Sequence, residues 1–397
     1  MKRILFFLIL ALLVVACGPD IQTNGPAEST ELVVAATATL EDTQAVPQSM
    51  VAPEETSLPA DIDAPLIEAP SIINIEMLDE VYGWALTETQ IIRTNDGGVT
   101  WYNVTPRDLA DVGFVYVNFF DMDTAWVQVP DMNQYPNGGK LFHTIDGGIT
   151  WESSATPFSS GSLHFVDEAN GWMMADLGVG AGSMAISIFQ TTDSGKTWNR
   201  VYTNDPNIAD AGVTLPLSGL KSVLLPLDMQ TAWVGGVVYA PGEMYLFRSR
   251  DGGVTWLQIN VVLPEGAGES EVSVQGIQFI SETEGLLALR LTSQIPQTVI
   301  YTTKDGGVTW SLLPVRFEGY GLLQTPSANE MIFYGNDQFY VTKDAGNTIE
   351  EVQPDIAFGE TILDMSFANS QTGWVVTYDQ ILYKTTDGGA TWISLTP

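Results

Sequence analysis

From residue 71 onward, the chain alternates short apolar stretches with polar turns, and no segment keeps the 3.6-residue period of an amphipathic helix. Within these stretches apolar and polar residues alternate with period two, and Val, Ile, Thr, Tyr and Phe are frequent, as in half-buried β-strands. The first group predicts strands at about 72–78, 83–86, 90–94 and 100–104. Because only short turns separate them, we expect an antiparallel four-stranded meander and an all-β fold.

One phrase repeats along this region. Thr-x-Asp-x-Gly-x-Thr-Trp first occurs at 94–101, and it returns at intervals of 39 to 58 residues. One copy begins with Ser249 and another ends in Ile349 rather than Trp. A period of roughly 40–50 residues built from short strands is typical of a β-propeller. We therefore predict a seven-bladed β-propeller of four-stranded blades over 71–397, with phrase aspartates Asp96, Asp146, Asp193, Asp251, Asp305, Asp344 and Asp387.

The repeated aspartates are interpreted as structural. Asp-Gly-Gly suits a hairpin turn, because Gly tolerates positive φ and an Asp side chain accepts hydrogen bonds from nearby backbone amides. Catalytic use of every copy would require one active site per repeat, so a turn-stabilising role is favoured. We expect the tryptophans that close the phrase to be packing residues: Trp101, Trp151, Trp198, Trp256, Trp310 and Trp392.

A second phrase precedes most copies. It is an aspartate followed a few residues later by Gly-Trp or Ala-Trp, and it supplies the other five of the eleven tryptophans. The stretch ending in Gly285-Leu286 is a weaker copy, and the sixth unit has lost the phrase near Glu330-Met331. Tryptophan placed by a repeat is expected to pack between structural units.

The first phrase resembles the Asp-box, or bacterial neuraminidase repeat. This repeat occurs in sialidases, sortilin-type receptors, some glycoside hydrolases and the photosystem II stability/assembly factor family. The two phrases together are most similar to the photosystem II stability/assembly factor family, over 72–397. The resemblance implies a propeller with a protein-binding role in the assembly of a membrane complex. Members of that family present basic patches to their partner, and this acidic chain departs from that property.

The N-terminus predicts export and anchoring. Lys2 and Arg3 precede twelve apolar residues, too few for a membrane-spanning helix and suited to a signal peptide. The ending Val-Val-Ala before Cys17 resembles the lipobox of bacterial lipoproteins, which implies a signal peptide at 1–16 and a lipid on Cys17; an ordinary secretory signal is the alternative. Residues 17–70 combine acidic residues with prolines and lack Lys, Arg and aromatic residues, so we predict a disordered tether holding the propeller outside the cytoplasm. Pairing of residues 65–67 or their neighbours with a terminal blade is the alternative for the end of this segment.

Composition excludes several classes of function. The chain has 48 acidic against 15 basic residues, which argues against binding nucleic acid or anionic lipid headgroups. One cysteine and two histidines make a zinc site unexpected, and we predict no metal and no cofactor.

Two candidate sites follow from the propeller architecture. The turns within the first and last strand pairs of each unit are short, whereas the middle loops and the crossovers vary in length, at 130–139, 176–182 and 239–243 for example. Insertions gathered on one face favour a binding face, and neutral loop variation is the alternative. The candidate residues of the predicted binding face are Asp131, Asn133, Tyr135, Asp176, Tyr239 and Glu243. Polar positions of the innermost strands predict a central channel lined by Glu76, Asn118, His164, Gln278 and Ser366, where a small polar ligand or water alone is expected.

The sequence therefore favours a protein-binding scaffold at the membrane without catalytic activity; a glycan partner or a sialidase-like glycosidase is the alternative. Sialidases need three converging arginines, and none of the seven arginines beyond the signal lies in a sialidase-like Arg-Ile-Pro phrase. Asp-box glucanases use paired aspartates in two tandem propellers, and one propeller is predicted here.

Overall fold

The structure is a computed structural model that describes residues 63–109, 112 and 114–396. These residues lie within one compact unit, Leu58–Pro397. The predicted signal peptide, Cys17 and residues 17–62 of the predicted tether lie outside the described residues. Within the described ranges the fold is all-β, as predicted, with one short 3-10 turn, η1 (Ala267–Glu269). No helix in these ranges has the length and apolarity needed to cross a membrane.

Strands follow one another along the chain with short connections. The first half comprises β1 (Leu66–Ile67), β2 (Ile72–Met77), β3 (Gly83–Thr87), β4 (Ile91–Thr94), β5 (Trp101–Asn103), β6 (Tyr116–Phe119), β7 (Ala125–Pro130), β8 (Gly139–Thr144), β9 (Glu152–Thr156), β10 (Gly161–Phe165), β11 (Gly171–Gly180), β12 (Ser183–Thr191) and β13 (Asn199–Thr203). The second half comprises β14 (Leu220–Pro226), β15 (Ala232–Val237), β16 (Tyr245–Ser249), β17 (Leu257–Gln258), β18 (Glu271–Phe279), β19 (Gly285–Thr292), β20 (Gln297–Thr303), β21 (Ser311–Glu318), β22 (Gly321–Gln324), β23 (Met331–Gly335), β24 (Gln338–Thr342), β25 (Glu350–Val352), β26 (Ile362–Phe367), β27 (Gly373–Thr377), β28 (Leu382–Thr385) and β29 (Ile393–Ser394).

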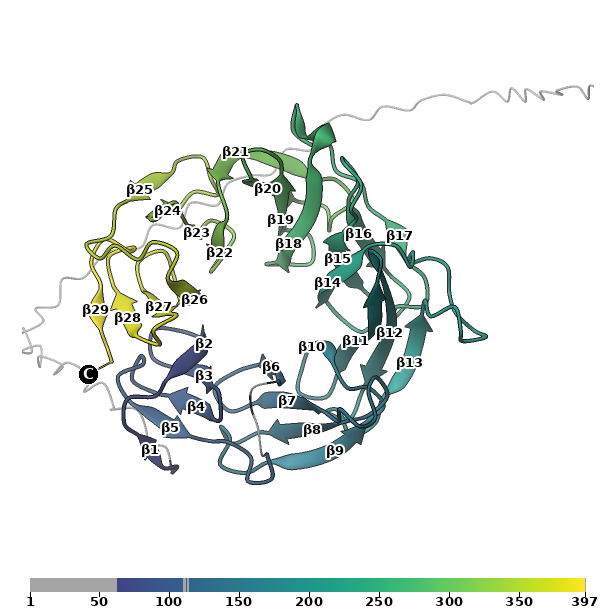
Figure 1. The fold of residues 1–397 in the computed structure, drawn as a ribbon, viewed down its shortest axis with the longest axis horizontal. Helices are drawn as coiled ribbons and strands as arrows, with labels where there is room; N and C mark the ends of the chain where they lie inside the picture. The colour runs from purple at the N-terminus through teal and green to yellow at the C-terminus, as the bar shows by residue number, and fades with distance from the viewer. Residues whose placement is uncertain (1–62, 110–111, 113, 397) are drawn as a thin grey trace, which may run out of the picture. The chain divides into compact units, whose positions relative to one another are not determined.

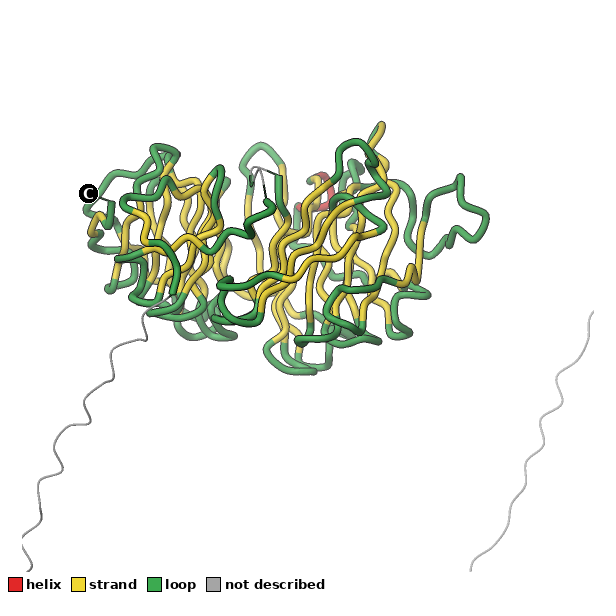
Figure 2. The backbone as a smooth tube through the Cα atoms, turned by 90° about the horizontal axis from the view of Figure 1, so that it is seen from below, coloured by secondary structure: helices red, strands yellow, loops and turns green. Residues whose placement is uncertain are grey.

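From β2 onward, each run of four strands pairs as an antiparallel meander in sequence order. The meanders succeed one another around a common axis, with the first strand of each innermost (Figure 1). Two meanders, β14–β17 and β18–β21, share one eight-stranded sheet because Val237 of β15 pairs with Ser273 of β18. The sheets therefore do not correspond one to one with the predicted blades. Figure 2 shows the strands crossing between two faces at which the loops gather.

The folded part begins before the predicted boundary at residue 71. Strand β1 pairs with β5 through Leu66↔Tyr102, so it adds a fifth strand at the outer edge of the first sheet. The Asn103 amide donates to the Pro65 carbonyl at 2.8 Å, which extends the same pairing. Residues 65–67, assigned from sequence to the tether, thus cover an edge strand that would otherwise be exposed.

A second difference concerns residues 176–182, which the sequence indicated as a long loop. Most of this segment continues β11 and β12, which pair up to Gly180↔Ser183. The connection is the two-residue turn Ala181-Gly182, and both residues have positive φ, 49° and 75°. Such a turn matches the twist of the flanking strands, so the Gly-rich sequence forms a projecting hairpin.

Apolar side chains pack mainly between neighbouring meanders. The cluster around Trp84 joins Ile91 of the β2–β5 meander to Phe119 and Phe142 of the β6–β9 meander. Trp84 is fully buried and stacks on Phe119 with ring centroids 5.0 Å apart. This burial of aromatic area between sheets is what holds successive meanders together.

The same packing joins the first and last meanders. One core cluster contains Ile75 and Trp101 together with Trp374 and Leu382. The Trp374 indole donates to the Gly97 carbonyl at 2.9 Å. No strand of one of these two meanders pairs with a strand of the other within the described part of the chain, so they meet through side-chain packing and hydrogen bonds.

Candidate functional site

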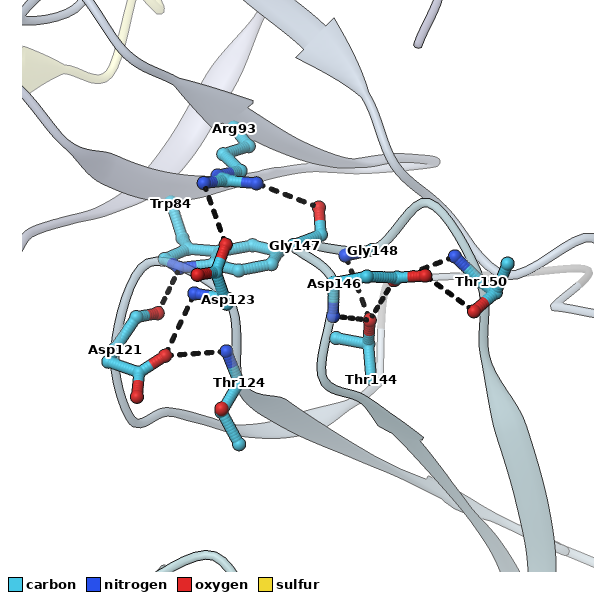
Figure 3. Close-up of polar contacts among 10 residues, drawn as sticks. All are labelled: Trp84, Arg93, Asp121, Asp123, Thr124, Thr144, Asp146, Gly147, Gly148 and Thr150. Atoms are coloured by element: carbon cyan, nitrogen blue, oxygen red, sulfur yellow. Dashed lines mark hydrogen bonds and ion pairs between the residues drawn. The ribbon is translucent and has the colours of Figure 1, made fainter. Parts of the chain in front are cut away.

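Each repeated turn is organised by its aspartate. Asp146 accepts hydrogen bonds from the Thr144 hydroxyl at 2.8 Å, the Thr150 amide at 2.8 Å and the Thr150 hydroxyl at 2.6 Å (Figure 3). The Thr144 hydroxyl in turn accepts from the Gly148 amide at 2.9 Å. Equivalent threonine or serine contacts surround Asp96, Asp193, Asp251, Asp305, Asp344 and Asp387.

Hydrogen bonds of this kind lower the carboxyl pKa of Asp146, Asp193, Asp251, Asp305, Asp344 and Asp387. At Asp305, the hydroxyl and the amide of Thr309 lower the carboxyl pKa to about 2. A carboxylate engaged in this way is neither a proton donor near neutral pH nor free to attack a substrate. The contacts therefore assign the aspartates to the turn geometry.

The phrase tryptophans close the same turns. The Trp101 indole donates to the Gly98 carbonyl at 3.0 Å, and the side chain is 2 % exposed. Trp151, Trp198, Trp256 and Trp392 make the corresponding bond within their own turns. Trp310 is the exception, because its buried indole nitrogen has no hydrogen-bond partner among the described residues.

A cation joins each of three meanders to the next. The Arg93 guanidinium lies 5.6 Å from the Trp84 ring, donates to the Gly147 carbonyl at 3.4 Å and pairs with Asp123 at 3.4 Å (Figure 3). The same arrangement joins Arg248 to Trp233 and Gly306, and Lys384 to Trp374 and Gly97. These charges are occupied in the fold and are not available to gather around a substrate.

The predicted binding-face residues lie on the ends of neighbouring meanders. Asp131, Asn133 and Tyr135 lie in the β7–β8 loop, where the Asp131 carboxylate accepts from the Asn133 amide at 2.9 Å. The Ser159 amide donates to the Pro136 carbonyl at 3.1 Å, and the Asp176 amide donates to the Ser160 carbonyl at 2.9 Å, so residues 159–160 connect this loop to β11. Burial and the Asp176 carboxylate raise the pKa of Tyr135. We call the face formed by the middle loops and the crossovers the loop face.

The loop face continues across the next two meanders. Gly219 of the β13–β14 crossover donates to the Gly182 carbonyl at 2.8 Å, which ties the crossover to the projecting hairpin. Tyr239 lies against the same hairpin, because its ring carbon Cδ2 is 3.4 Å from the position that a Cβ atom would occupy if Gly182 had a side chain. Tyr239 and Glu243 are both exposed in the β15–β16 loop. The structure thus brings Tyr135, Asp176 and Tyr239 onto adjoining segments.

Exposed aromatic side chains favour this face. Among the described residues, six of the seven exposed Phe and Tyr side chains lie in its loops, its crossovers or the adjoining strand end: Phe114, Tyr116, Tyr135, Tyr239, Tyr320 and Tyr378. Only Phe120 lies at the opposite face, next to the turn of Asp121. Exposed aromatic residues combine apolar area with few rotatable bonds, which suits a binding surface.

Several predicted channel residues instead connect innermost strands. The Asn118 amide oxygen accepts from the Phe165 amide at 2.8 Å, and the Ser366 hydroxyl accepts from the Met77 amide at 2.9 Å. Gln278 forms a hydrogen bond with the Thr325 hydroxyl. Gln324 is a further member of this set that the sequence analysis missed, because the sixth unit lacks the second phrase. Its strand pairing opposite Ile332 identifies it as the equivalent position.

Glu76 and His164 are the titratable members of the channel set. Desolvation raises the pKa of Glu76 to about 7, and the Asp364 carboxylate adds to this shift. Part of the Glu76 side chain is nevertheless exposed to solvent. Burial lowers the pKa of His164 to about 4, so this imidazole is neutral near pH 7. Asp364 itself accepts from the Ile75 amide at 2.9 Å and from the Asn74 side chain at 2.8 Å. The channel wall thus contains a carboxyl group that can exchange a proton near neutral pH.

No family model matches the chain. Among curated proteins, it is 24 % identical over 271 residues to a xyloglucanase from Paenibacillus sp., which covers 60 % of this chain and 24 % of the relative. It is also 24 % identical over 280 residues to the xyloglucanase Xgh74A of Acetivibrio thermocellus, covering 65 % of this chain and 29 % of the relative. The chain spans about a quarter of the length of these relatives.

Solved structures share the fold. The structure of YCF48 bound to D1 peptide has a TM-score of 0.53 at 17 % identity, covering 83 % of this chain and 99 % of that one. The GH74 xyloglucanase from Xanthomonas campestris has a TM-score of 0.56 at 11 % identity, covering 84 % and 56 %. Together with the all-β meanders, these likenesses support a β-propeller.

The expectation of a protein without catalytic activity is wrong on this comparison. The curated relatives are named xyloglucanases, and a solved GH74 xyloglucanase shares the fold, so the relatives point to a glycoside hydrolase. Missing sialidase arginines exclude only a sialidase, and a single predicted propeller does not bear on a likeness that covers about a quarter of a larger enzyme.

Proposed function

We propose that this protein is a lipid-anchored, extracytoplasmic, seven-bladed Asp-box propeller that binds a polypeptide segment of a partner at the membrane through its loop face. The observation that carries this proposal is the concentration of exposed aromatic side chains on that face. The fold shared with YCF48 bound to D1 peptide adds support for a peptide-sized ligand on such a propeller. Cys17 carries the anchor in this proposal, and the tether gives the propeller reach along the membrane surface.

The loop face also has a defined charge character. Asp131, Asp176 and Glu243 lie among its tyrosines, whereas its loops contribute few basic groups. This combination suits a polar, wet contact with a neutral or basic segment. Association with a basic segment is then expected to slow as salt rises, because screening weakens long-range attraction.

Peptide arrays test this function directly. The probe is a set of synthetic peptides covering the extracytoplasmic loops and termini of membrane proteins from the same cells, bound by the purified soluble propeller. Tyr135→Ala and Tyr239→Ala are expected to weaken capture of the positive peptides, whereas Ile145→Ala, an exposed residue of the opposite face, is the matched control. Loss of capture in the control with no effect of the tyrosine changes would place binding elsewhere.

Glycoside hydrolysis is the second candidate, and two observations favour it. The sequence relatives are xyloglucanases, and Glu76 of this chain has a pKa of about 7 next to a second carboxyl group, Asp364. Hydrolysis of a glycosidic bond uses two carboxyl groups, of which the general acid must hold its proton near the working pH. In this candidate Glu76 is the acid, and the channel mouth is the site.

The test is release of reducing ends from xyloglucan. The wild-type protein is expected to lose activity as the pH rises through about 7, because the acid form of Glu76 is then depleted. Glu76→Gln removes the proton donor without changing the size of the side chain, and Glu88→Gln on the exposed β3–β4 loop is the matched control. Activity that survives in Glu76→Gln would exclude this residue as the acid.

A further inference from the structure

A cavity of about 620 Å³ lies between two neighbouring meanders, whose innermost strands are β18 and β22 (Figure 1). The volume is within the roughly 300–1,000 Å³ of pockets that hold small organic molecules. Neither Tyr239 of the loop face nor Glu76 of the channel set lines this cavity. The inference below therefore goes beyond both functions proposed above and depends on neither.

The cavity opens where a polar side chain that joins two innermost strands elsewhere is missing. Between the last and first meanders, Asp364 of β26 accepts from the Ile75 amide and Ser366 accepts from the Met77 amide, both at 2.9 Å. Strand pairing places Gly276 of β18 at the position equivalent to Asp364. A glycine has no side chain that could reach the next strand, so β18 and β22 are not joined in this way.

Gly276 leaves open space at the wall of the cavity. A Cβ atom placed on this residue would meet nothing within 4 Å apart from its chain neighbours. Its φ lies outside the positive range that favours glycine, so the backbone conformation does not require glycine here. Gln278, two residues further on, meets the Thr325 hydroxyl of the next meander, whereas Ser366 at the equivalent position meets a backbone amide. A contact between two side chains spans a wider gap than a contact from a side chain to the backbone.

Two solvent-accessible glutamine side chains flank this space. Gln278 is half-buried, and it accepts from the Thr325 hydroxyl through Oε1, whereas its Nε2 makes no hydrogen bond to any described residue. Gln275, at the β-bulge before Gly276, is exposed, and its Nε2 donates to the Ser273 hydroxyl at 2.9 Å, which leaves Oε1 unpaired. The cavity therefore offers a ligand one amide donor and one carbonyl acceptor, both of them uncharged.

The charges around the cavity favour a neutral ligand. Among the described residues no carboxylate lines it, so a cationic ligand finds no ion-pair partner there. Arg290 is the charged residue of the lining, and its guanidinium is engaged with the Gly321 carbonyl at 3.0 Å and lies 5.5 Å from the Tyr320 ring. A hydroxyl group both donates and accepts hydrogen bonds, so a ligand with several hydroxyls matches the two glutamine side chains.

We propose that this cavity binds a neutral saccharide, whose ring occupies the space beside Gly276 and whose hydroxyls contact Gln275 and Gln278. One hydroxyl accepts from Nε2 of Gln278, and another donates to Oε1 of Gln275. Pro326 also lines the cavity and is half-buried, so it offers apolar surface to the C–H groups of the sugar ring. Hydrogen bonds fix the orientation of the ligand, and the release of water from apolar surface adds to the affinity.

Ligand-observed NMR titration of the full-length protein, in a detergent without a sugar headgroup, tests the chemistry of the ligand. Methyl β-glucoside is the neutral probe, and methyl β-glucuronide is the same ring with a carboxylate. N-acetyl-alaninamide is a neutral probe that has amide groups and no hydroxyl. We expect the glucoside to bind at millimolar concentration and the other two compounds to bind roughly tenfold more weakly or not at all. Absence of glucoside binding, or equal binding of either other compound, would overturn the proposal.

Two variants locate the site, and melting temperatures show that each is folded. Gly276→Leu fills the open space and is expected to abolish glucoside binding; Gly268→Leu is the matched control, because Gly268 is exposed and a Cβ on it also meets nothing within 4 Å. Gln278→Leu removes the amide donor and is expected to weaken binding roughly tenfold, whereas Gln258→Leu on exposed β17 is its control. Unchanged binding in Gln278→Leu, or an equal loss in its control, would refute the assignment even if Gly276→Leu did not fold.

Discussion

Replacing Trp84 with leucine tests how the meanders are held together, because it reproduces at one junction the residue found naturally at position 286. Trp84 is fully buried, stacks on Phe119 at 5.0 Å with an interplanar angle of 6°, and donates to the Asp121 carbonyl at 3.0 Å. Truncating a buried tryptophan to alanine costs about 3–5 kcal/mol, and leucine recovers part of the lost contact area. Loss of the indole hydrogen bond adds about 1 kcal/mol. We expect a net destabilisation of about 3 kcal/mol.

Urea denaturation followed by far-ultraviolet circular dichroism measures this cost, since the signal does not depend on the number of tryptophans. The midpoint is expected to fall while the slope of the transition stays constant, which marks a change in stability alone. Ile145→Ala, at a side chain that is 68 % exposed, is the control and should change the free energy of unfolding by less than about 0.5 kcal/mol. A loss below about 1 kcal/mol in Trp84→Leu would refute the claim that interleaved tryptophans hold the meanders together.

Four further outcomes are expected. Asp146→Ala removes three hydrogen bonds from its turn and should lower the free energy of unfolding by about 2 kcal/mol in a urea titration; an unchanged midpoint would contradict the structural role. Gly148→Val forces a β-branched residue to a φ of 83°, with its Cβ 2.6 Å from Val104, and should cost about 1–3 kcal/mol by the same measurement. The folded protein holds the Glu76 proton up to about pH 7, whereas the unfolded chain releases it near pH 4.5, so the stability of the wild type decreases as the pH rises from 4.5 to about 7. Glu76→Gln should therefore have a higher melting temperature than the wild type above pH 7 and no higher one below pH 4.5. Cys17→Ala should release the protein from the membrane fraction, and unaltered fractionation would remove the lipoprotein prediction.

The strands were predictable because their signals are local. Alternation of apolar and polar residues and the Asp-Gly-Gly turns act within a few residues, and β3, β4 and β5 lie close to the expected ranges. The segment 176–182 was misassigned because glycine is common both in loops and in two-residue hairpin turns, and the positive φ of Ala181 is not visible in the sequence. Composition assigned residues 65–67 to the tether, and their pairing with a terminal blade was open as the alternative; the pairing of β1 with β5 confirms that alternative.

The candidate sites were predictable only in part. The position of Tyr135, Asp176 and Tyr239 on neighbouring segments follows from the repeat, because equivalent loops of successive units share a face. The raised pKa of Glu76 depends on Asp364, which belongs to the last meander, and no local pattern connects the two residues.

Site-specific photo-crosslinking in intact membranes tests the proposed binding face most directly. A photoreactive phenylalanine analogue is introduced at Tyr239 on the loop face, and at Ile145 on the opposite face as the control, in the full-length protein; both side chains are exposed. We expect a discrete covalent adduct with a polypeptide from position 239, absent from position 145 and reduced by Tyr135→Ala. An adduct formed from position 145 alone, or no polypeptide adduct from position 239, would contradict it.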